Sequence, residues 1–378
     1  MNADVHSHPE TGTAPAMTGG RVTERLRVGL VGAGWWGVAN HLPILKSRAD
    51  VELTAVCRLG AAELAKVQKA FDIPFGTQDF GAMLDQAPMD ALVVASPHRL
   101  HGEHAIAALQ RGLHVLVEKP MATSLAEARA IADLARRKER HVLVPYGWNF
   151  KPFFAAARDL VRQGRIGRIR HVSAQMASPI GDLMTGSDLA GTEQEMFRPD
   201  PQTWANPATG GYGWGQLVHL LGGLFYITDL VPREVFAFVG RSDAGADLYN
   251  AVALRFAGDA TGTLSGSATA PPGSAFQVDV RVFGDAGMLL LDVERERLSL
   301  RRIDGANIDV PIAAGEGAYA CIEPVHRFVD LCLGKEVENC GNAEVGLRSV
   351  EVIDAMLRSA ESGRREAIRP EAAGEGPR

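Results

Sequence analysis

Hydrophobic runs in the first half of the chain alternate with stretches of helical periodicity. Apolar runs bounded by turn residues predict strands at Arg27–Val31, Glu52–Val56, Ala91–Ala95, His114–Val117 and His141–Pro145. Apolar positions at helical spacing predict helices at Val38–Arg48, Gly102–Arg111 and Leu125–Lys138. Such alternation is typical of a doubly wound parallel sheet, so we predict a dinucleotide-binding Rossmann unit over residues 25–146.

The pattern changes after about Pro145. Runs separated by turn residues predict strands at Ile169–Ala177, Glu234–Gly240, Ala251–Phe256, Gly262–Ala268, Ala275–Gly284 and Met288–Asp292. These favour a large, mostly antiparallel sheet, which makes residues 147–368 an α+β unit for substrate binding and oligomerisation. Helices predicted at Cys321–Leu333 and Ala343–Ser362 would brace both units, with the second ending near Gly363.

Composition agrees with a two-domain enzyme and excludes several other classes. The 378 residues exceed what one core usually serves, and 46% of them are hydrophobic. The net charge of -6 and the lack of a basic stripe argue against nucleic acid or an anionic membrane as partner. No apolar run reaches the ~18 residues of a membrane span. The four cysteines show no C-x-x-C spacing, which is typical of reduced thiols in a cytoplasmic protein.

The two ends of the chain are small, polar or charged. Residues 1–24 lack the apolar core of a secretion signal, and residues 369–378 are similarly polar. Both are predicted to be disordered tails without catalytic residues.

A glycine-rich turn follows the first predicted strand. Gly32, Gly34 and Gly37 have the G-x-G-x-x-G spacing and lead into a predicted helix. The first glycine permits a tight turn, the second lets a pyrophosphate approach the backbone, and the third lets the helix pack close to the strand. Trp35 and Trp36 lie inside this turn and must face the cofactor or the cleft between the units. This context predicts a dinucleotide site.

Arg58 bears on the choice of cofactor. It follows the second strand about 20 residues after the glycines, where a carboxylate would bind the ribose hydroxyls of NAD. A guanidinium pairs instead with a 2′-phosphate, so the sequence favours NADP(H), with NAD(H) as the other option. The alternative is a solvated surface arginine.

Glu118, Lys119 and Pro120 stand where another apolar strand leaves the sheet, which is the ligand edge of a doubly wound fold. A lysine partly desolvated there would have a lowered pKa and could exchange a proton with a substrate hydroxyl. The alternative is a lysine that follows a strand and points to water.

Taken together, the motifs resemble one known family. The chain from about Arg27 to Ile368 is similar to the glucose-fructose oxidoreductase, inositol dehydrogenase and MocA family (Gfo/Idh/MocA). The similarity includes the glycine turn, S-P-H-R-L-H-G-E-H-A from Ser96, H-V-L-V-E-K-P-M-A-T-S from His114, Y-G-W-N-F-K-P from Tyr146, and a glycine-rich run ending in His219. Order and spacing both match.

The resemblance implies roles for individual residues. Lys119 would sit between nicotinamide and substrate, with Glu118 as a structural or cofactor-contacting neighbour and often a cis bond before Pro120. His219 would face the substrate as a proton-transfer partner that titrates near neutrality. Three residues of the loop after the strand at 91–95 would pack along the cofactor: Ser96, Pro97 and His101.

The chain departs from the family pattern at Gly215. Members of this family commonly carry an aspartate four residues before the histidine, one helical turn away. Tyr212, Gln216 or the loop 181–204 would then supply the polar contacts to substrate, or the chemistry differs from that of ordinary dehydrogenases. Trp204 and Tyr212 are also predicted to line the substrate site, because aromatic rings stack on the apolar faces of sugars.

Some of these residues have structural alternatives. His219 lies in the apolar run Leu217–Tyr226, where a buried core histidine is the alternative to a catalyst, and Trp148 is interpreted as a core residue. The spacing of His98, His101 and His104 hints at a metal, but they lack a carboxylate or thiolate partner of recognised spacing, so no metal site is predicted.

The main hypothesis is an NAD(P)-dependent oxidoreductase that transfers a hydride between nicotinamide and a carbinol of a sugar, sugar derivative or cyclitol, with Lys119 and His219 as catalytic candidates. The alternatives are a redox-assisted lyase or glycoside-cleaving enzyme with retained cofactor, a biliverdin-reductase-like reduction, and a non-catalytic NADP-binding regulator. The resemblance implies a homodimer or homotetramer formed through the second sheet. The sequence alone names neither the substrate, the reaction direction nor the subunit number.

Overall fold

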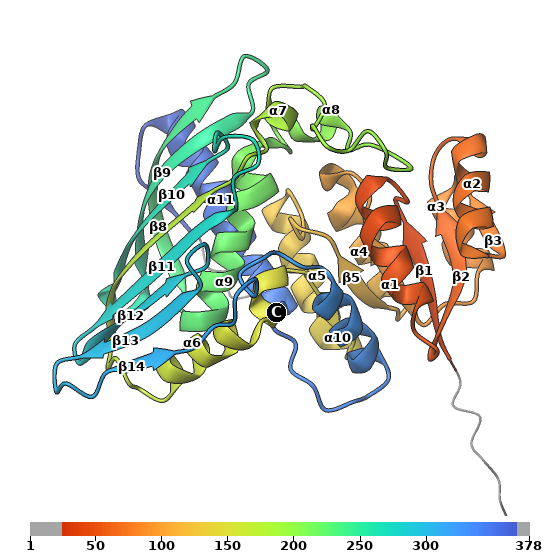
Figure 1. The fold of residues 1–378 in the computed structure, drawn as a ribbon. Coiled ribbons are helices and arrows are strands. Elements are labelled where there is room, and N and C mark those ends of the chain that lie inside the picture. Colours follow the sequence, from red (N-terminus) through yellow and green to blue (C-terminus); the bar gives the residue numbers. More distant parts are fainter. Residues whose placement is uncertain (1–24, 369–378) are drawn as a thin grey trace, which may run out of the picture.

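A computed structural model describes residues 25–368, and the expectations for the two tails lie outside this range. Figure 1 shows two units side by side: a sheet with helices on both of its faces, and a larger sheet with helices on one face. The predicted α/β class, with a parallel sheet followed by a mostly antiparallel one, is confirmed. No helix in the described part is long and apolar enough to cross a membrane.

The first sheet has six parallel strands in the order β3-β2-β1-β4-β5-β6. Its strands are β1 (Leu26–Val31), β2 (Val51–Cys57), β3 (Phe75–Thr77), β4 (Ala91–Val94), β5 (His114–Val117) and β6 (Val142–Leu143). Its helices are α1 (Leu42–Lys46), α2 (Ala61–Phe71), α3 (Phe80–Gln86), α4 (His101–Gln110) and α5 (Leu125–Lys138). The order reverses between β1 and β4, so the crevice at their carboxyl ends is where a doubly wound fold binds its ligand.

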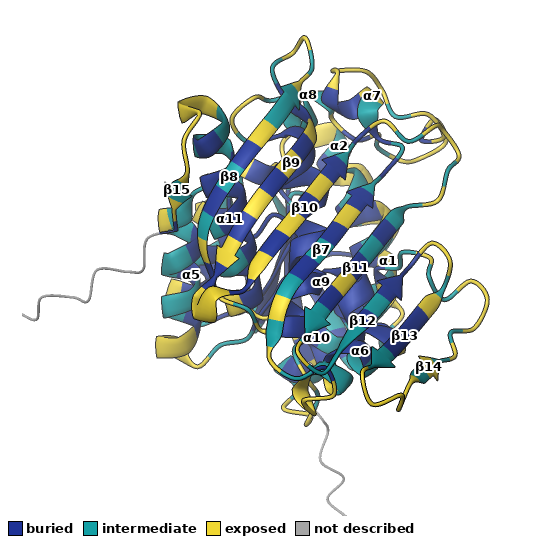
Figure 2. Ribbon diagram, turned by 90° about the vertical axis from the view of Figure 1, so that its left-hand side faces the viewer, coloured by how far each residue is buried: buried dark blue, intermediate teal, exposed yellow. Residues whose placement is uncertain are grey.

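The second sheet has nine strands in the order β14-β13-β12-β11-β7-β10-β9-β8-β15. They are β7 (Ile169–Ala177), β8 (Pro232–Arg241), β9 (Asp247–Phe256), β10 (Thr261–Ser267), β11 (Gln277–Gly284), β12 (Gly287–Asp292), β13 (Arg297–Arg302), β14 (Ile308–Val310) and β15 (Glu366–Ala367). Only β7 and β10 pair in parallel. Figure 2 shows exposed and buried positions alternating along β8, β9 and β10, because one face of this sheet packs on helices and the other is open.

Between residues 147 and 368 the structure has six α-helices: α6 (Pro152–Arg162), α7 (Gly181–Met184), α8 (Pro201–Trp204), α9 (Val218–Thr228), α10 (Ile322–Cys332) and α11 (Ala343–Ser362). The side chain of Asn342 accepts hydrogen bonds from two backbone amides at the start of α11, and Gly363 ends the helix with φ of 65°. Helix α11 packs against β8 and α5, and α10 packs against α1. Both final helices therefore contact both halves of the molecule.

Two helices, α1 and α9, are preceded by a π-helical turn that the sequence pattern did not reveal. One turn is Gly37–His41, before α1, and the other is Gly213–Leu217, before α9. A π turn bonds residue i to i+5 and rotates the following side chains relative to an α-helix. Gly215 and His219 are therefore not related by one ordinary α-helical turn, which the sequence analysis assumed.

Candidate active site

The glycine turn after β1 has the geometry of a phosphate-binding turn. Gly32 has φ of +84°, and a Cβ there would lie 2.2 Å from the backbone nitrogen of Ser96. A Cβ on Gly37 would lie 3.3 Å from the carbonyl oxygen of Gly32, so the helix is packed close to the turn. A Cβ on Gly34 would meet no atom closer than the carbonyl oxygen of Gly32, at 4.0 Å, which leaves room for a ligand to approach the backbone. This arrangement supports the roles predicted for the three glycines.

The indole rings of Trp35 and Trp36 complete this turn. The Nε1 atom of Trp35 is buried and finds no hydrogen-bond partner among residues 25–368. A buried donor without an acceptor is costly, and a polar ligand in the turn would satisfy it. The two rings meet at 5.2 Å between centres, and the Trp36 ring lies 6.4 Å from that of Tyr319 in the second half of the chain. The turn therefore fits a dinucleotide and also faces the other unit.

Arg58 lies beside the same turn. Its Nη1 donates to the carbonyl oxygen of Ala33 at 2.7 Å, and its Nε donates to the carbonyl oxygen of Leu59 at 3.1 Å. The guanidinium also lies over the ring of Phe197, 3.9 Å from its centre. Arg58 is thus held against the dinucleotide turn, and it does not project freely into solvent.

The loop after β4 is tied to the loop after β5 by a histidine. The ring nitrogens of His101 lie 2.7 Å from the carbonyl oxygens of Ser96 and Pro120. His101 is 1% exposed, and the Ser96 hydroxyl lies 3.0 Å from Nδ1 of His104. His101 therefore fixes two loops at the ligand edge relative to each other, while Pro97, between Ser96 and the following helical turn, is exposed.

Lys119 is buried where β5 leaves the sheet, and the bond between Lys119 and Pro120 is cis, as the resemblance implied. Its Nζ donates to the carbonyl oxygen of Gly215 at 3.0 Å and lies 4.9 Å from the ring centre of Trp204. Burial lowers the pKa of Lys119 below its ordinary value, although the charge of Glu118 opposes this shift. The ammonium can therefore release its proton more readily than that of a solvated lysine.

Glu118 is anchored behind this lysine. Its Oε1 is 2.8 Å from Nε2 of the fully buried His41, and its Oε2 accepts the backbone N–H of Lys119 at 3.1 Å. Burial raises the pKa of Glu118, but the hydrogen bond from His41 and the nearby positive charges outweigh it and leave the pKa below the ordinary value. Glu118 is therefore a buried carboxylate that balances the charge of Lys119.

Cys321 joins His41 and Glu118 to form a group whose ligand atoms lie within 4.8 Å of one another. Histidine, carboxylate and thiolate are all metal ligands. However, the neighbouring ammonium of Lys119 disfavours a cation there, and Nδ1 of His41 lacks the hydrogen-bond acceptor that usually orients a metal-binding histidine. We interpret the cluster as support for Lys119 and not as a metal centre.

His219 lies on α9 inside a group of aromatic rings. The rings of Tyr319, Trp148 and Tyr146 surround it at 5.1, 5.9 and 6.1 Å between centres, all edge to face. Its Nδ1 has no partner among the described residues. Burial, and then the charge of Lys119, lower the pKa of His219 well below its usual value. The imidazole is therefore neutral at neutral pH, and the expectation that it titrates near neutrality is wrong because the sequence did not reveal its desolvation.

The space beside Gly215 is filled by an aromatic ring. A Cβ at this position would lie 2.5 Å from Cζ3 of Trp204 and 3.5 Å from Cε of Met184. Here the chain brings an indole from α8 to the position where the family pattern has a carboxylate side chain. Gln216, the next residue, is 6% exposed.

The structure does not bring every predicted substrate residue to this cluster. Tyr212 is fully buried against the second sheet, where its hydroxyl donates to the carbonyl oxygen of Met176 at 3.0 Å. A Cβ on Gly266 of β10 would lie 2.7 Å from the Tyr212 ring, so this tyrosine fills the layer between helix and sheet. Its assignment to substrate binding is corrected to a packing role.

Trp148 is buried as expected, and its Nε1 donates to the carbonyl oxygen of Gly317 at 2.9 Å. Its ring also borders His219.

Sequence reasoning missed four residues of the site: His41, Phe197, Tyr319 and Cys321. Tyr319 and Cys321 come from the segment between β14 and α10, which has no periodic pattern, and Phe197 comes from a polar loop. Two of them carried a positional signal: His41 lies inside a predicted helix, four residues after Gly37, and Phe197 lies in the loop 181–204, which was considered for polar contacts only.

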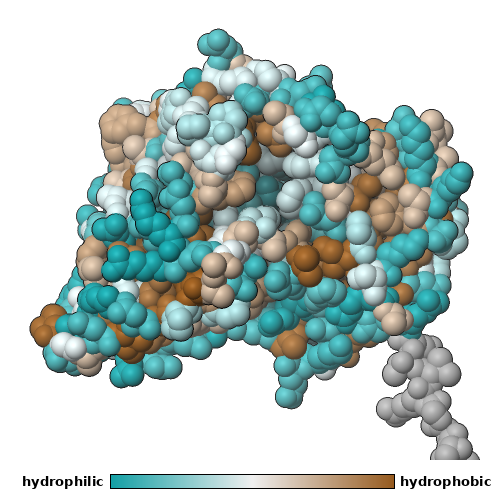
Figure 3. Space-filling model, viewed as in Figure 1, coloured by the Kyte–Doolittle hydropathy of each residue, from teal (hydrophilic) through white to brown (hydrophobic). Residues whose placement is uncertain are grey.

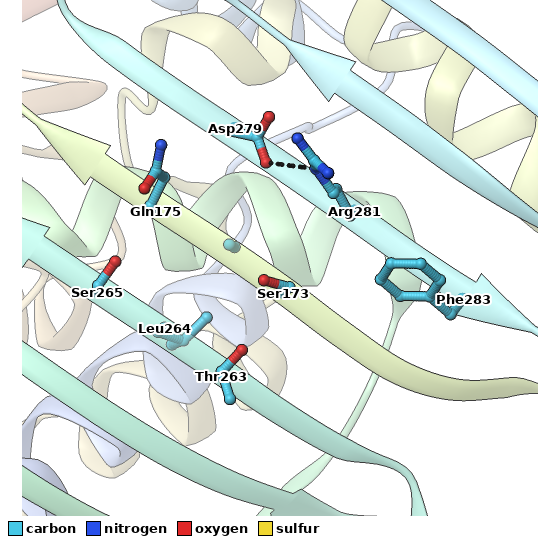
Figure 4. Close-up of a pocket in the computed structure, with 9 residues that line it drawn as sticks. Ser173, Gln175, Thr263, Leu264, Ser265, Asp279, Arg281 and Phe283 are labelled. Carbon is cyan, nitrogen blue, oxygen red and sulfur yellow. Dashed lines mark hydrogen bonds and ion pairs between the residues drawn. The ribbon is translucent and has the colours of Figure 1, made fainter.

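A hollow of about 340 Å³ lies on the open face of the second sheet. Figure 4 shows that it is lined by side chains from β7, β10 and β11, with Arg281 and Asp279 paired at 3.1 Å beside Phe283. It is separate from the depression between the two units that Figure 3 shows in the face viewed as in Figure 1. Lys119 lies where the two units meet, since its Nζ donates to the carbonyl oxygen of Gly215.

Comparison with known proteins agrees with this geometry, which is that of a dinucleotide-dependent oxidoreductase. Residues 26–146 match the oxidoreductase family with an NAD-binding Rossmann fold, GFO/IDH/MocA, and residues 154–290 match the GFO/IDH/MocA C-terminal domain. The chain belongs to the GFO/IDH/MocA family of oxidoreductases, as the motifs predicted.

Several individual proteins are similar to this chain. A dTDP-3,4-didehydro-2,6-dideoxy-alpha-D-glucose 3-reductase from Streptomyces violaceoruber is 26% identical over 346 residues, covering 89% of this chain and 95% of the relative. A D-glucoside 3-dehydrogenase from Escherichia coli (strain K12) is 30% identical over 170 residues, which is 44% of this chain and 48% of the relative. Other alignments span about half of the relatives' length or less. A levoglucosan dehydrogenase solved with NADH superposes with a TM-score of 0.72 at 20% identity, covering 92% of this chain and all of that one.

Proposed function

We propose that this protein is an NAD(P)-dependent oxidoreductase that transfers a hydride between nicotinamide and a carbinol carbon of a sugar, sugar derivative or cyclitol. One observation carries the proposal: a lysine is buried at the ligand edge of the first sheet, where its Nζ donates to the carbonyl oxygen of Gly215 and its charge acts on the buried His219. That the similar proteins named above are sugar dehydrogenases and reductases supports the substrate class.

The nicotinamide cofactor, when bound, supplies the hydride donor or acceptor. In the oxidation direction, Lys119 accepts the proton of the substrate hydroxyl, and in reduction it returns that proton to the oxygen. Glu118, held by His41, keeps a compensating charge beneath the amine. His219, which is neutral, is the second group able to hydrogen-bond the reacting hydroxyl, and the surrounding aromatic rings keep water away from it.

The cofactor assignment favours NADP(H). Gly32, Gly34 and Gly37 would accommodate the pyrophosphate, with Trp35, Trp36, Ser96, Pro97 and His101 around it, and Arg58 would bind the 2′-phosphate. Arg58→Asp is therefore expected to reverse the order of affinities from NADP(H) to NAD(H), as measured by titration of each nucleotide. Tighter binding of NAD(H) by the unmutated protein would contradict this assignment.

A direct experiment tests the reaction type. The purified protein is mixed with NADP or NAD and a panel of sugars, sugar derivatives and inositols, and both nicotinamide absorbance and product composition are followed. Net cofactor reduction supports the proposed dehydrogenase. Product change without net reduction would point to a redox-assisted lyase or hydrolase, and the absence of any change with all members of the panel would point to a binding protein.

We also propose that residues 25–146 and 147–368 form separate domains and that the protein is cytoplasmic.

We propose further that a homodimer or homotetramer forms through the second sheet. The support is the open face of this sheet, where Phe238 on β8 and Tyr249 on β9 are 70% and 45% exposed. Sedimentation of the protein should give a mass above that of the monomer, and Phe238→Glu should shift it toward the monomer.

A further inference from the structure

One segment crosses from the second unit to the first. Residues 185–204, which we call the strap, follow α7 and end with α8, and Figure 1 shows this part of the chain reaching over the top of the molecule toward the first sheet. Arg198 gives the strap its shape, since its Nη1 pairs with Asp188 at 2.9 Å and its Nη2 donates to the carbonyl oxygen of Leu189 at 3.2 Å. The strap is therefore an ordered element and can hold a side chain in a defined place.

The strap contacts two cations of the first unit through two aromatic rings. Phe197 lies under the guanidinium of Arg58 at 3.9 Å, and Trp204 lies against the ammonium of Lys119 at 4.9 Å. His98, at the ligand edge, faces the Trp204 ring at 5.2 Å, and its Nδ1 lies 3.1 Å from the carbonyl oxygen of Thr209 just beyond the strap. The two cations are those assigned above to the cofactor and to the substrate.

The contacts of Arg58 leave a specific part of its guanidinium free. Ala33 and Leu59 accept hydrogen bonds from Nη1 and Nε, and the ring of Phe197 covers one face. Nη2 makes no hydrogen bond to residues 25–368. A phosphate binds a guanidinium through its N–H groups in the plane of the group, whereas an aromatic ring packs on the face, so the two contacts are compatible. The ring restricts the plane in which the free N–H groups lie.

We propose that Phe197 is a positioning residue for cofactor selectivity: by stacking on Arg58 it aims the guanidinium at the 2′-phosphate of NADP(H). This inference rests on the assignment of Arg58 in the proposed function. It adds that part of the selectivity is supplied by the second unit. The same strap also carries Trp204, whose ring lies against Lys119. One segment of the second unit thus contacts both the residue proposed to bind the 2′-phosphate and the residue proposed to move the proton.

The test compares nucleotide affinities of the full chain by titration. Phe197→Leu is expected to weaken NADPH and adenosine 2′-monophosphate about 3- to 10-fold, the loss expected for one cation–π contact, while NADH binding is unchanged. Phe197→Tyr keeps an aromatic face and should bind NADPH as the unmutated protein does. Met196→Ala is the matched control, since this neighbouring side chain on the strap is 46% exposed. In turnover, Phe197→Leu should raise KM for NADP and leave kcat unchanged.

The double variant decides whether Phe197 acts through Arg58. In an Arg58→Ala background, Phe197→Leu should have no further effect on NADPH affinity. Equal losses for NADPH and NADH, or a full effect of Phe197→Leu without Arg58, would overturn the inference while the proposed function stands. An Arg58→Ala protein with unchanged preference between the nucleotides would instead remove the cofactor assignment, and the inference with it, without touching the roles of Lys119 and His219.

Discussion

The two units build their shares of the site in different ways. In the first unit, the functional groups follow β1, β4 and β5 directly and sit in short turns fixed by backbone contacts, as at Gly32 and Lys119. In the second unit they come from separate pieces: the strap, the π turn before α9 and the segment between β14 and α10. The first unit therefore holds its functional groups on a rigid sheet edge, whereas each group of the second unit depends on a separate loop or turn.

The largest expected effect concerns the rigid edge. Lys119→Ala should lower kcat by roughly 10²-fold or more, the size associated with a positioned proton-transfer group, while the affinity for the nucleotide stays within a few-fold. Stopped assays of turnover and separate nucleotide titrations measure the two quantities. A Lys119→Ala protein with near-normal kcat would mean that the amine only supports the structure, and the comparison above would fail.

A smaller effect is expected for the histidine supplied by the second unit. His219→Ala should lower kcat about 10-fold, below the effect of Lys119, because one hydrogen bond to the reacting hydroxyl is lost. Its pKa is depressed, so it stays neutral as pH falls through neutrality, and it should not set the pH profile. In the oxidation direction activity should rise with pH as Lys119 loses its proton and should level off below the ordinary lysine pKa of 10.5.

His219→Gln distinguishes a hydrogen-bonding role of residue 219 from a proton-transfer role, since glutamine keeps a hydrogen-bonding side chain that does not titrate. The shape of its pH profile of kcat should match that of the unmutated protein. Loss of a titration step near neutrality in this variant would show that the imidazole, and not Lys119, moves the proton.

The smallest effect tests the packing of the strap. Gly215→Ala places a Cβ 2.5 Å from the Trp204 ring, so the indole must move, and overpacking of this kind costs about 1–3 kcal/mol of stability. We expect kcat/KM to fall about 3- to 10-fold as the ring leaves Lys119, on the scale of one cation–π contact. The effect should shrink when Gly215→Ala is made in a Trp204→Ala background, where no ring opposes the new methyl group. Additive effects on thermal stability and kcat/KM in the double variant would contradict this coupling.

The sequence predicted most of the sheet framework: buried apolar runs marked β1, β4 and β5, and a strand with alternate buried positions, β7, was also located to within about one residue. It missed β3, β13, β14 and β15, which are short or partly exposed and lack a continuous apolar signal. The glycines and Lys119 could be found because their spacing follows from backbone geometry. Tyr319 and Phe197 could not, because tertiary packing of irregular loops brings them to the site.

The contact between Phe197 and Arg58 has a consequence for protein engineering. A chimera that joins the first 146 residues of this chain to the second half of a relative would keep Arg58 and replace the strap that carries Phe197. Under the role proposed for Phe197, exchange of the dinucleotide-binding half alone would carry over only part of the preference between NADP(H) and NAD(H), and the strap would have to be exchanged with it.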